Sequence, residues 1–253
     1  MTWSNDKGGS GTASGTTNWS ISGISLSSGD NVITVTVTDG ANNVGTDTIT
    51  VTYSTSSQIL TTNVAYTISS VTVDGNLNES GWNIITDVNK TVVGSVNNTA
   101  QFGILWDSTY LYVGVKVLDS NLYNDSTTVY DDDSIEIYID GDHNRGTTYD
   151  SNDRQYIKGW NDSSILEKSG KTTGVQHAWG TISGGYSVEV AIPWTNLGIT
   201  PTEGMTIGFD IGYNDDDNGT GREGQAVWTG TKDSWQNTSV LGDAVLGKKN
   251  QLR

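Results

Sequence analysis

The chain has 253 residues and a formal net charge of −16, with only 13 Lys and Arg. This balance argues against nucleic acid as a partner, because phosphate binding needs a basic surface. Cysteine is absent, so disulfides and thiolate chemistry are excluded, and no apolar run approaches the about 20 residues that a membrane-spanning helix needs. The abundance of Gly, Ser, Thr and Asn, with Val, Ile and Tyr, favours strands and tight turns, and therefore an all-β fold.

The first 53 residues alternate between apolar and polar side chains with a period of two, which is typical of β-strands. The segments with this pattern are 18–21, 31–38 and 46–53. Trp19–Leu26, Gly29–Asn31 and the closing Thr-rich strand resemble the bacterial Ig-like repeats of large surface proteins. Since a full sandwich of this class has about seven strands and about 100 residues, the resemblance implies a small, incomplete Ig-like β-sandwich over residues 1–53.

A second, larger domain is expected after a linker at residues 54–65, which begins with a Ser-rich stretch. The segment 66–253 is long enough to bury a core of its own. Its cleanest alternating segments are 109–117, 133–140, 186–192 and 205–213. In each of them one face is apolar and the other carries polar, aromatic or glycine residues, which predicts antiparallel strands with one core face.

The polar faces of these strands are expected to form one shared surface of the larger domain. Glycines would lower the floor of this surface, and aromatic rings and carboxylates would form the walls of a shallow cleft. An ordinary solvated sheet face is the alternative. The residues assigned to this surface are Tyr112, Lys116, Glu136, Tyr138, Glu189 and Asp210.

Several short motifs of the larger domain occur in a recognisable order and spacing. They are Val73–Trp82, Leu105–Val113, Asp133–Asp140, Asp153–Tyr156, Gly185–Trp194, Ile207–Ile211 and Ala226–Trp228. Together they resemble the family 9 carbohydrate-binding modules over residues 66 to 248. The resemblance implies a non-catalytic, jelly-roll-like β-sandwich attached to secreted polysaccharide-degrading enzymes. It also implies structural calcium and a slot in which two aromatic rings hold a terminal sugar.

The resemblance also assigns roles to individual residues of the sugar slot. The two rings fall at Tyr130 and Trp235, and a glutamate that binds sugar hydroxyls falls at Glu136. Sugar hydroxyls need hydrogen-bond partners once water is displaced, even where the ring stacks on an aromatic face. The further candidates for these hydrogen bonds are Gln155, Asp210 and Lys232.

The chain departs from the family pattern at positions that would grip the end sugar. Ile157 stands where the pattern has an arginine, and Gly159 stands where it has an asparagine. Amides are expected near Gly212 and Lys232, and neither residue is an amide. These departures predict weak or altered sugar specificity.

Two acidic turns are rich in oxygen donors, as calcium-binding loops are. The first places Asp140, Asp142 and Asn144 at alternating positions, and the second is the continuous run at 214–219 that contains Asp215 and Asp216. Neither turn has the glutamate that closes an EF-hand. We expect structural calcium in at least one turn, with a solvated acidic turn as the alternative. Two His and no Cys make a zinc or redox-metal site improbable.

Three classes of function remain open from the sequence. The first is a carbohydrate-binding module of a secreted or cell-surface polysaccharide-processing protein, with a glycan and further extracellular domains as partners. The second is a structural or adhesive surface domain without a sugar ligand. The third is a glycoside hydrolase, which needs two carboxylates about 5 to 9.5 Å apart; the candidates are Glu136, Glu189 and Asp210. The absence of a signal peptide suggests an internal fragment of an extracellular protein.

Overall fold

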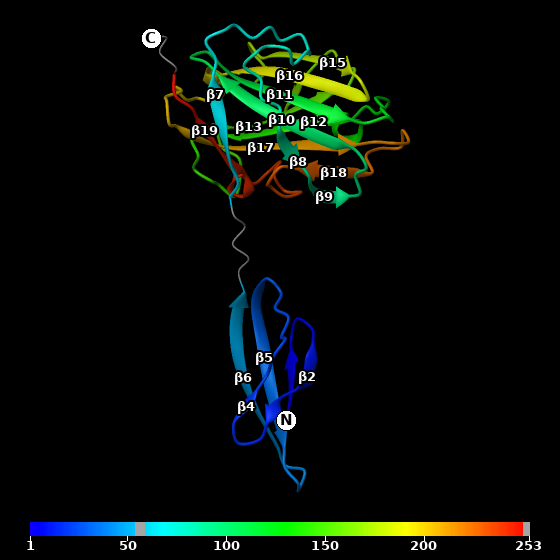
Figure 1. The fold of residues 1–253 in the computed structure, drawn as a ribbon, viewed down its shortest axis with the longest axis vertical. Coiled ribbons are helices and arrows are strands. Elements are labelled where there is room, and N and C mark those ends of the chain that lie inside the picture. Colours follow the sequence, from blue (N-terminus) through cyan, green and yellow to red (C-terminus); the bar gives the residue numbers. More distant parts are fainter. Residues whose placement is uncertain (54–58, 250–253) are drawn as a thin grey trace. The chain divides into compact units, whose positions relative to one another are not determined.

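The computed structural model describes residues 1–53 and 59–249 of the chain (Figure 1). Over these residues the chain forms β-strands and short 3-10 helices, so the all-β prediction is confirmed. The chain divides into two compact units, Met1–Gln58 and Ile59–Arg253. No helix in the described part of the chain has the length and apolar character needed to cross a bilayer.

The N-terminal unit contains a four-stranded sheet in the order β2-β1-β5-β6 and a separate β3–β4 hairpin. The strands are β1 (Thr2–Asn5), β2 (Ser10–Thr12), β3 (Ser14–Gly15), β4 (Trp19–Ser20), β5 (Gly29–Thr38) and β6 (Val44–Tyr53). Alternation in β5 buries Asn31 and Ile33 on one face, opposite a face rich in threonine. The Ig-like assignment of this unit stays a prediction.

The predicted linker at 54–65 is only partly described by the structure. Its first five residues, 54–58, lie outside the described residues. The predicted C-terminal boundary of the linker, residue 65, is wrong, because Thr61–Tyr66 form strand β7. This strand pairs in parallel with both β19 (Gly242–Leu246) and β10 (Thr99–Trp106). Polar residues dominate this short strand, and only Val64 of it is fully buried, so its sequence carries little strand signal.

The larger unit folds into two sheets joined through β7. The first, called here the β12 sheet, comprises β9 (Lys90–Gly94), β12 (Ser134–Asp140), β13 (Asp153–Gly159), β14 (Leu166–Glu167), β17 (Thr206–Asp215), β18 (Gly224–Val227) and β19. The second, called the β11 sheet, comprises β8 (Thr86–Val88), β10, β11 (Tyr110–Leu118), β15 (Gln176–Ile182) and β16 (Gly185–Pro193). The 3-10 helices are η1 (Val129–Asp131), η2 (Trp194–Asn196) and η3 (Thr238–Val240).

The core of the larger unit consists of the apolar faces that the alternation predicts. Ile137 lies opposite Ile211 of β17 and Tyr156 of β13, and all three side chains are fully buried. Each fully buried side chain of this size stabilises the fold by about 1.5 to 3 kcal/mol relative to an exposed one. The other members that the sequence pattern identifies are Leu111, Val113, Val115, Val117, Ile135, Ile139, Tyr186, Val188, Val190, Ile192, Ile207, Phe209 and Tyr213.

The expected single polar surface is wrong, because its members lie on two different sheets. Glu136, Tyr138 and Asp210 lie on the outer side of the β12 sheet. Tyr112, Lys116 and Glu189 lie on the outer side of the β11 sheet, across the core. Alternation separates a core face from an outer face, but it does not say to which sheet a strand belongs.

The contacts of Glu189 show that another segment of the chain covers the outer face of the β11 sheet. Its Oε2 accepts hydrogen bonds from the backbone N–H groups of Asp74 and Gly75 at 3.0 and 2.8 Å, and its Oε1 accepts one from Trp82 at 3.2 Å. These contacts hold a covering segment on the β11 sheet. Glu189 therefore cannot form a hydrolytic pair with Glu136.

The placement of β7 predicts where the chain can be shortened. Deletion of residues 1–58 should leave the melting temperature of the larger unit nearly unchanged, because no strand of its two sheets is lost. Deletion of residues 1–66 should prevent folding, since it removes the strand between β19 and β10. Circular dichroism melts of the two truncated chains test this. Equal stability of the two would contradict the role assigned to β7.

Candidate functional site

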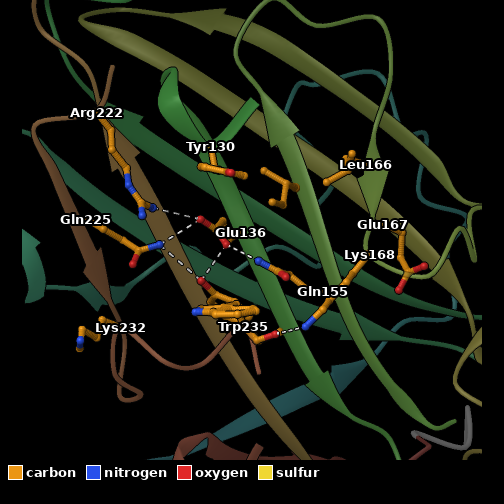
Figure 2. A pocket seen from close by; sticks show the side chains of 12 residues that line it. Tyr130, Glu136, Gln155, Leu166, Glu167, Lys168, Arg222, Gln225, Lys232 and Trp235 are labelled. Carbon is orange, nitrogen blue, oxygen red and sulfur yellow. Dashed lines mark hydrogen bonds and ion pairs between the residues drawn. The ribbon is translucent and has the colours of Figure 1, made fainter. Parts of the chain in front are cut away.

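A pocket of about 540 Å³ opens on the outer side of the β12 sheet (Figure 2). Side chains of β12, β13 and β18 form its floor, and η1, β14 and the loop after β18 supply its rim. The residues that line it are Tyr130, Glu136, Tyr138, Gln155, Ile157, Leu166, Glu167, Lys168, Arg222, Gln225, Lys232 and Trp235. All the sequence-predicted ligand residues except Asp210 are among them.

Two exposed aromatic rings stand at the rim of the pocket. Tyr130 of η1 is 43% exposed and Trp235 is 44% exposed, although most large rings of this unit are buried. A cation accompanies each ring: the Arg222 guanidinium lies 5.7 Å from the Tyr130 centroid, and Lys168 Nζ lies 4.6 Å from the Trp235 centroid. Exposed rings beside polar groups suit ligands with both an apolar face and hydroxyl groups, which is the chemistry of a sugar.

The floor of the pocket is organised around the buried carboxylate of Glu136, which is 3% exposed. Its Oε2 accepts hydrogen bonds from Tyr138 Oη at 2.8 Å and Gln155 Nε2 at 2.6 Å. Its Oε1 accepts from Asn214 Nδ2 at 2.8 Å and Gln225 Nε2 at 2.9 Å. Burial, together with the nearby Glu136 charge, raises the pKa of Tyr138 well above its usual value, so Tyr138 remains a donor at neutral pH.

Asp210 lies below the pocket rather than in it, contrary to the expectation from the sequence. Its carboxylate is fully buried and accepts backbone N–H bonds from Ile211 at 2.9 Å, Trp228 at 3.1 Å, Thr229 at 3.1 Å and Gly230 at 2.6 Å. Burial raises the pKa of Asp210 to about 7, and the four N–H donors act in the opposite direction. Asp210 therefore fixes the turn from which the Trp235 loop begins.

The loop that carries Trp235 is held by further contacts along its backbone. Lys90 Nζ donates to the carbonyl oxygens of Thr229 and Gly230 at 2.7 and 2.6 Å. Tyr149 Oη donates to the carbonyl of Ser234 at 2.8 Å. Lys168 Nζ donates to the carbonyl of Trp235 at 2.8 Å, as the dashed line in Figure 2 shows. A loop fixed in this way loses little conformational freedom when a ligand binds.

The residues missing from the sequence-based site are chiefly Lys168, Arg222 and Gln225. Gln225 lies on the short strand β18, where four residues give little periodic signal, and it faces Glu136. Arg222 comes from a loop rich in Asp and Gly, and its Nη1 donates to Asn214 Oδ1 at 2.7 Å and lies 3.6 Å from Glu136 Oε1. No local pattern brings this guanidinium to the floor of the pocket.

The structure places the departures from the family pattern beside the pocket floor and its rim. A Cβ at Gly159 would require the Asp162 carboxylate to move. A Cβ at Gly212 would meet the Tyr138 ring at an ordinary contact distance of 3.4 Å, so sterics do not explain the glycine there. Ile157 lies buried in the pocket wall and offers no hydrogen bond. The Arg222 guanidinium reaches the floor of the pocket from the connection between β17 and β18 rather than from β13, which carries Ile157.

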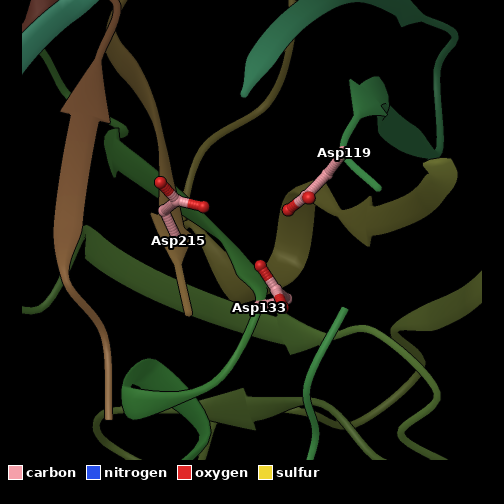
Figure 3. A group of neighbouring side chains, drawn as sticks. All are labelled: Asp119, Asp133 and Asp215. Carbon is pink, nitrogen blue, oxygen red and sulfur yellow. The ribbon is translucent and has the colours of Figure 1, made fainter. Parts of the chain in front are cut away.

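Within residues 1–53 and 59–249, carboxylates gather in three clusters, and in each cluster the donor atoms lie within 4.8 Å of one another. The first cluster is Asp119, Asp133 and Asp215 (Figure 3), the second is Asp125, Asp132 and Asp216, and the third is Asp140, Asp142 and Asp153. The predicted turn at 140–144 contributes Asp140 and Asp142 to one cluster, whereas the neighbours Asp215 and Asp216 belong to two. Asn144 instead bonds within its turn, where its Oδ1 accepts from Gly146 N at 2.9 Å.

Buried oxygen atoms that find no hydrogen-bond partner in the described part of the chain accompany all three clusters. They are Asp153 Oδ1 and Asp216 Oδ2, and beside the first cluster Asn98 Oδ1. Asn98 Nδ2 donates to Asp119 Oδ2 at 3.1 Å and to Asp215 Oδ1 at 3.0 Å, which places that side chain against the first cluster. Crowded carboxylate and amide oxygens fit a hard cation such as Ca²⁺.

The fold and the pocket together define a class of protein. A β-sandwich that presents two exposed rings around a hydrogen-bonding floor, on the outer side of one sheet, has the architecture of a carbohydrate-binding domain. The model of the family described as "Carbohydrate family 9 binding domain-like" matches residues 73–249. The chain belongs to this family, and the recognition made from the sequence motifs is confirmed.

Relatives and solved structures agree with this assignment. The chain is 36% identical over 180 residues to "Endo-1,4-beta-xylanase A" of Thermoanaerobacterium saccharolyticum, a match that covers 70% of this chain and 15% of that protein. It is also 36% identical over 180 residues to "Exoglucanase XynX" of Acetivibrio thermocellus, covering 70% of this chain and 16% of that protein. The match thus spans about one sixth of the length of these relatives.

A family 9 module from Caldicellulosiruptor kristjanssonii, solved in complex with cellotriose, superposes with a TM-score of 0.69 at 26% identity. That match covers 76% of this chain and 95% of the module. The same kind of module in complex with glucose gives a TM-score of 0.68 at 26% identity, covering 76% of this chain and 99% of that one.

The role of Asp210 as an anchor can be tested by Asp210→Asn. The amide would point N–H groups at backbone donors, and leaving such buried donors unpaired costs about 1 to 3 kcal/mol. We therefore expect a lower melting temperature and an altered environment of the Trp235 indole. Thermal melts and tryptophan fluorescence report on both.

Asp233→Asn in the same loop is the matched control. Among the described residues its carboxylate accepts a single long hydrogen bond, 3.4 Å from Gln236 Nε2, so a change within about 0.5 kcal/mol is expected. Equal effects of the two substitutions would show that the Asp210 carboxylate is not the anchor.

Proposed function

We propose that the larger unit is a non-catalytic module that binds a neutral or substituted β-linked polysaccharide by holding one sugar ring between Tyr130 and Trp235. The pair of exposed rings flanking a hydrogen-bonding floor is the observation that carries this proposal. The similar modules solved with cellotriose and with glucose support it. The relatives described above, a xylanase and an exoglucanase, support it as well.

The rings and the floor would contribute different parts of the binding. Stacking on Tyr130 and Trp235 removes the apolar C–H faces of the sugar from water. The amides of Gln155 and Gln225 already donate to Glu136, and their carbonyl oxygens remain as acceptors for sugar hydroxyls. Stacking would therefore supply most of the affinity, and the floor would set the orientation of the ring.

The placement of the carboxylates favours binding over hydrolysis. Of the carboxylates considered from the sequence, only Glu136 lines the pocket, while Asp210 is an anchor below it and Glu189 lies on the other sheet. The other lining carboxylate, Glu167, accepts N–H bonds from Ser169 and Lys171 at 2.8 and 2.6 Å. Both lining carboxylates therefore serve as acceptors within the protein.

We further propose that this chain is part of a longer extracellular protein that processes polysaccharides. The short match to a much longer xylanase and a much longer exoglucanase supports this, because the match covers 15% and 16% of their lengths. In such a protein the N-terminal unit, proposed to be Ig-like, would act as a spacer between the sugar-binding module and other domains.

The stacking proposal is tested with Trp235→Ala and Tyr130→Ala. Loss of a stacking ring removes about 1 to 3 kcal/mol of binding free energy, so Trp235→Ala should weaken binding to cellotriose by roughly 5- to 150-fold. Tyr130→Ala should weaken binding less, because the smaller ring covers less of the sugar. Isothermal titration calorimetry measures both, and the melting temperatures should change little, since both rings are exposed.

The N-terminal unit offers matched controls. Trp19 is 46% exposed and Tyr53 is 42% exposed, so Trp19→Ala and Tyr53→Ala remove similar rings elsewhere and should leave binding unchanged. A cellotriose affinity unchanged by Trp235→Ala would place the site elsewhere. An intact chain that binds no glycan would favour the structural or adhesive alternative.

We also propose that calcium occupies the acidic clusters and is structural. The clusters lie where the two walls of the pocket are attached to the sheet. Asp132 and Asp133 follow η1 directly and so lie next to the Tyr130 wall. Asp140 begins the turn in which the Gly146 carbonyl accepts hydrogen bonds from Thr238 and Ser239, both at 3.0 Å, beside the Trp235 loop. Cations at these places would hold both walls.

The clusters predict how calcium dependence changes with pH. Burial raises the pKa of Asp133 to about 8 and those of Asp153 and Asp215 to about 6. Without a cation, the folded state keeps protons that the unfolded chain releases at about pH 4. The free energy of unfolding of the metal-free protein should therefore fall as the pH rises from about 4, and should level off above the folded pKa values of about 6 and about 8.

Calcium favours the ionised carboxylates, so its stabilising effect should grow over the same pH range. At a hundredfold excess over Kd it should reach about 2.7 kcal/mol per site, and magnesium should be less effective because it dehydrates reluctantly. Melting curves in chelator and in calcium, recorded at several pH values, measure this. Curves that coincide at every pH would remove calcium from the proposal.

A further inference from the structure

The sugar pocket is a basic region in an acidic chain. Lys168, Arg222 and Lys232 are three of the 13 basic residues of the chain, and all three line the pocket. They face only two lining carboxylates, Glu136 and Glu167. The lining therefore carries a formal charge of +1, whereas the chain carries −16.

Both carboxylates are already engaged by donors of the protein. Glu136 is 3% exposed and accepts four side-chain hydrogen bonds, two at each oxygen. Glu167 is 7% exposed, and its Oε2 accepts hydrogen bonds from the backbone of Ser169 and Lys171 and from Ser169 Oγ. Little of their hydrogen-bonding capacity faces a ligand, so the polar groups that remain open to the pocket are mainly cationic donors.

The cations keep donors open to the pocket. Arg222 uses Nη1 to bond Asn214, and within residues 1–53 and 59–249 its Nη2 and Nε form no hydrogen bond. Lys232 is exposed and forms neither a hydrogen bond nor an ion pair with any described residue. Figure 2 shows Arg222, Gln225 and Lys232 along one side of the pocket and Lys168 on the other.

We propose that the pocket prefers an acidic sugar, namely a uronic acid residue of a polysaccharide, whose carboxylate is held by Arg222 and Lys232. The proposal rests on the proposed function, in which the sugar ring lies between Tyr130 and Trp235. Arginine matches a carboxylate with two parallel donors, and charge-assisted hydrogen bonds are about twice as strong as neutral ones. A neutral sugar would leave this charge complementarity unused.

Screening decides whether the acidic remainder of the chain opposes such a ligand. At physiological ionic strength the Debye length is about 8 Å, so charges farther from the ligand contribute little. The cations that line the pocket act at contact distance, well within this length. The local charge of the pocket, rather than the net charge of the chain, therefore determines the preference.

The experiment compares two ligands that differ in one carboxylate: xylotriose, and xylotriose carrying one glucuronic acid. Isothermal titration calorimetry on the full chain, at physiological salt, should give a dissociation constant about tenfold lower for the acidic ligand, as one added charge-assisted contact provides. Lys232→Gln and Arg222→Gln should each reduce this ratio toward one. Lys116→Gln, which removes an exposed cation from the outer side of the β11 sheet, should leave the ratio unchanged.

Acetate at equal ionic strength identifies what the cations recognise. It should not compete with the acidic trisaccharide, because recognition of the carboxylate depends on stacking of the attached sugar. Effective competition by acetate would overturn the proposal in favour of a simple anion site.

The remaining outcomes separate this proposal from the proposed function. Equal affinity for xylotriose with and without the glucuronic acid would overturn the acidic-sugar preference while the sugar-binding function stands. So would a preference that survives both Lys232→Gln and Arg222→Gln. Absence of binding to these ligands and to cellotriose would instead overturn the sugar-binding function, and this proposal with it.

Discussion

The buried carboxylate of Glu136 is the constraint on which the pocket depends. A buried charge without partners costs several kcal/mol, so its oxygens must be satisfied wherever they lie. Here the donors come from four different strands: Tyr138 on β12, Gln155 on β13, Asn214 on β17 and Gln225 on β18. One side chain thus ties four strands together on their outer side, opposite the apolar core. The floor is a connected hydrogen-bond network, whereas the Trp235 loop at the rim is held by separate contacts from Asp210, Lys90 and Lys168.

Much of the fold follows from local patterns, and the limits of those patterns are physical. Alternation identified which side chains of β11, β12, β16 and β17 are buried, because each strand has one face against the core. It did not identify the sheet to which a strand belongs, so Glu189 was placed beside Glu136 when the core separates them. The sequence pattern does not predict strand β7, because its polar residues are stabilised by pairing with strands on both sides rather than by burial of their own side chains.

The candidate site shows the same division between local and long-range information. Tyr130, Glu136 and Trp235 could be placed through short motifs that keep their order along the chain. Arg222 could not, because a loop of Asp and Gly has no period and its direction is set by contacts with distant strands. For the same reason, the sequence identifies only some of the carboxylates in each acidic cluster. Asp119, Asp133 and Asp215 come from three separate regions, and only the folded sheet brings their oxygens together (Figure 3).

The pairing of β7 with β19 has a mechanical consequence. These are the first and last strands of the larger unit, and they run parallel, with Thr61 opposite Asp243 and Val64 opposite Leu246. A pull on the start of β7 and on the end of β19 therefore acts in opposite directions along neighbouring strands. Such a load shears all the hydrogen bonds between the two strands at once, whereas strands pulled apart from one end would lose their bonds one after another. The larger unit is thus built to resist tension along the chain that passes through it.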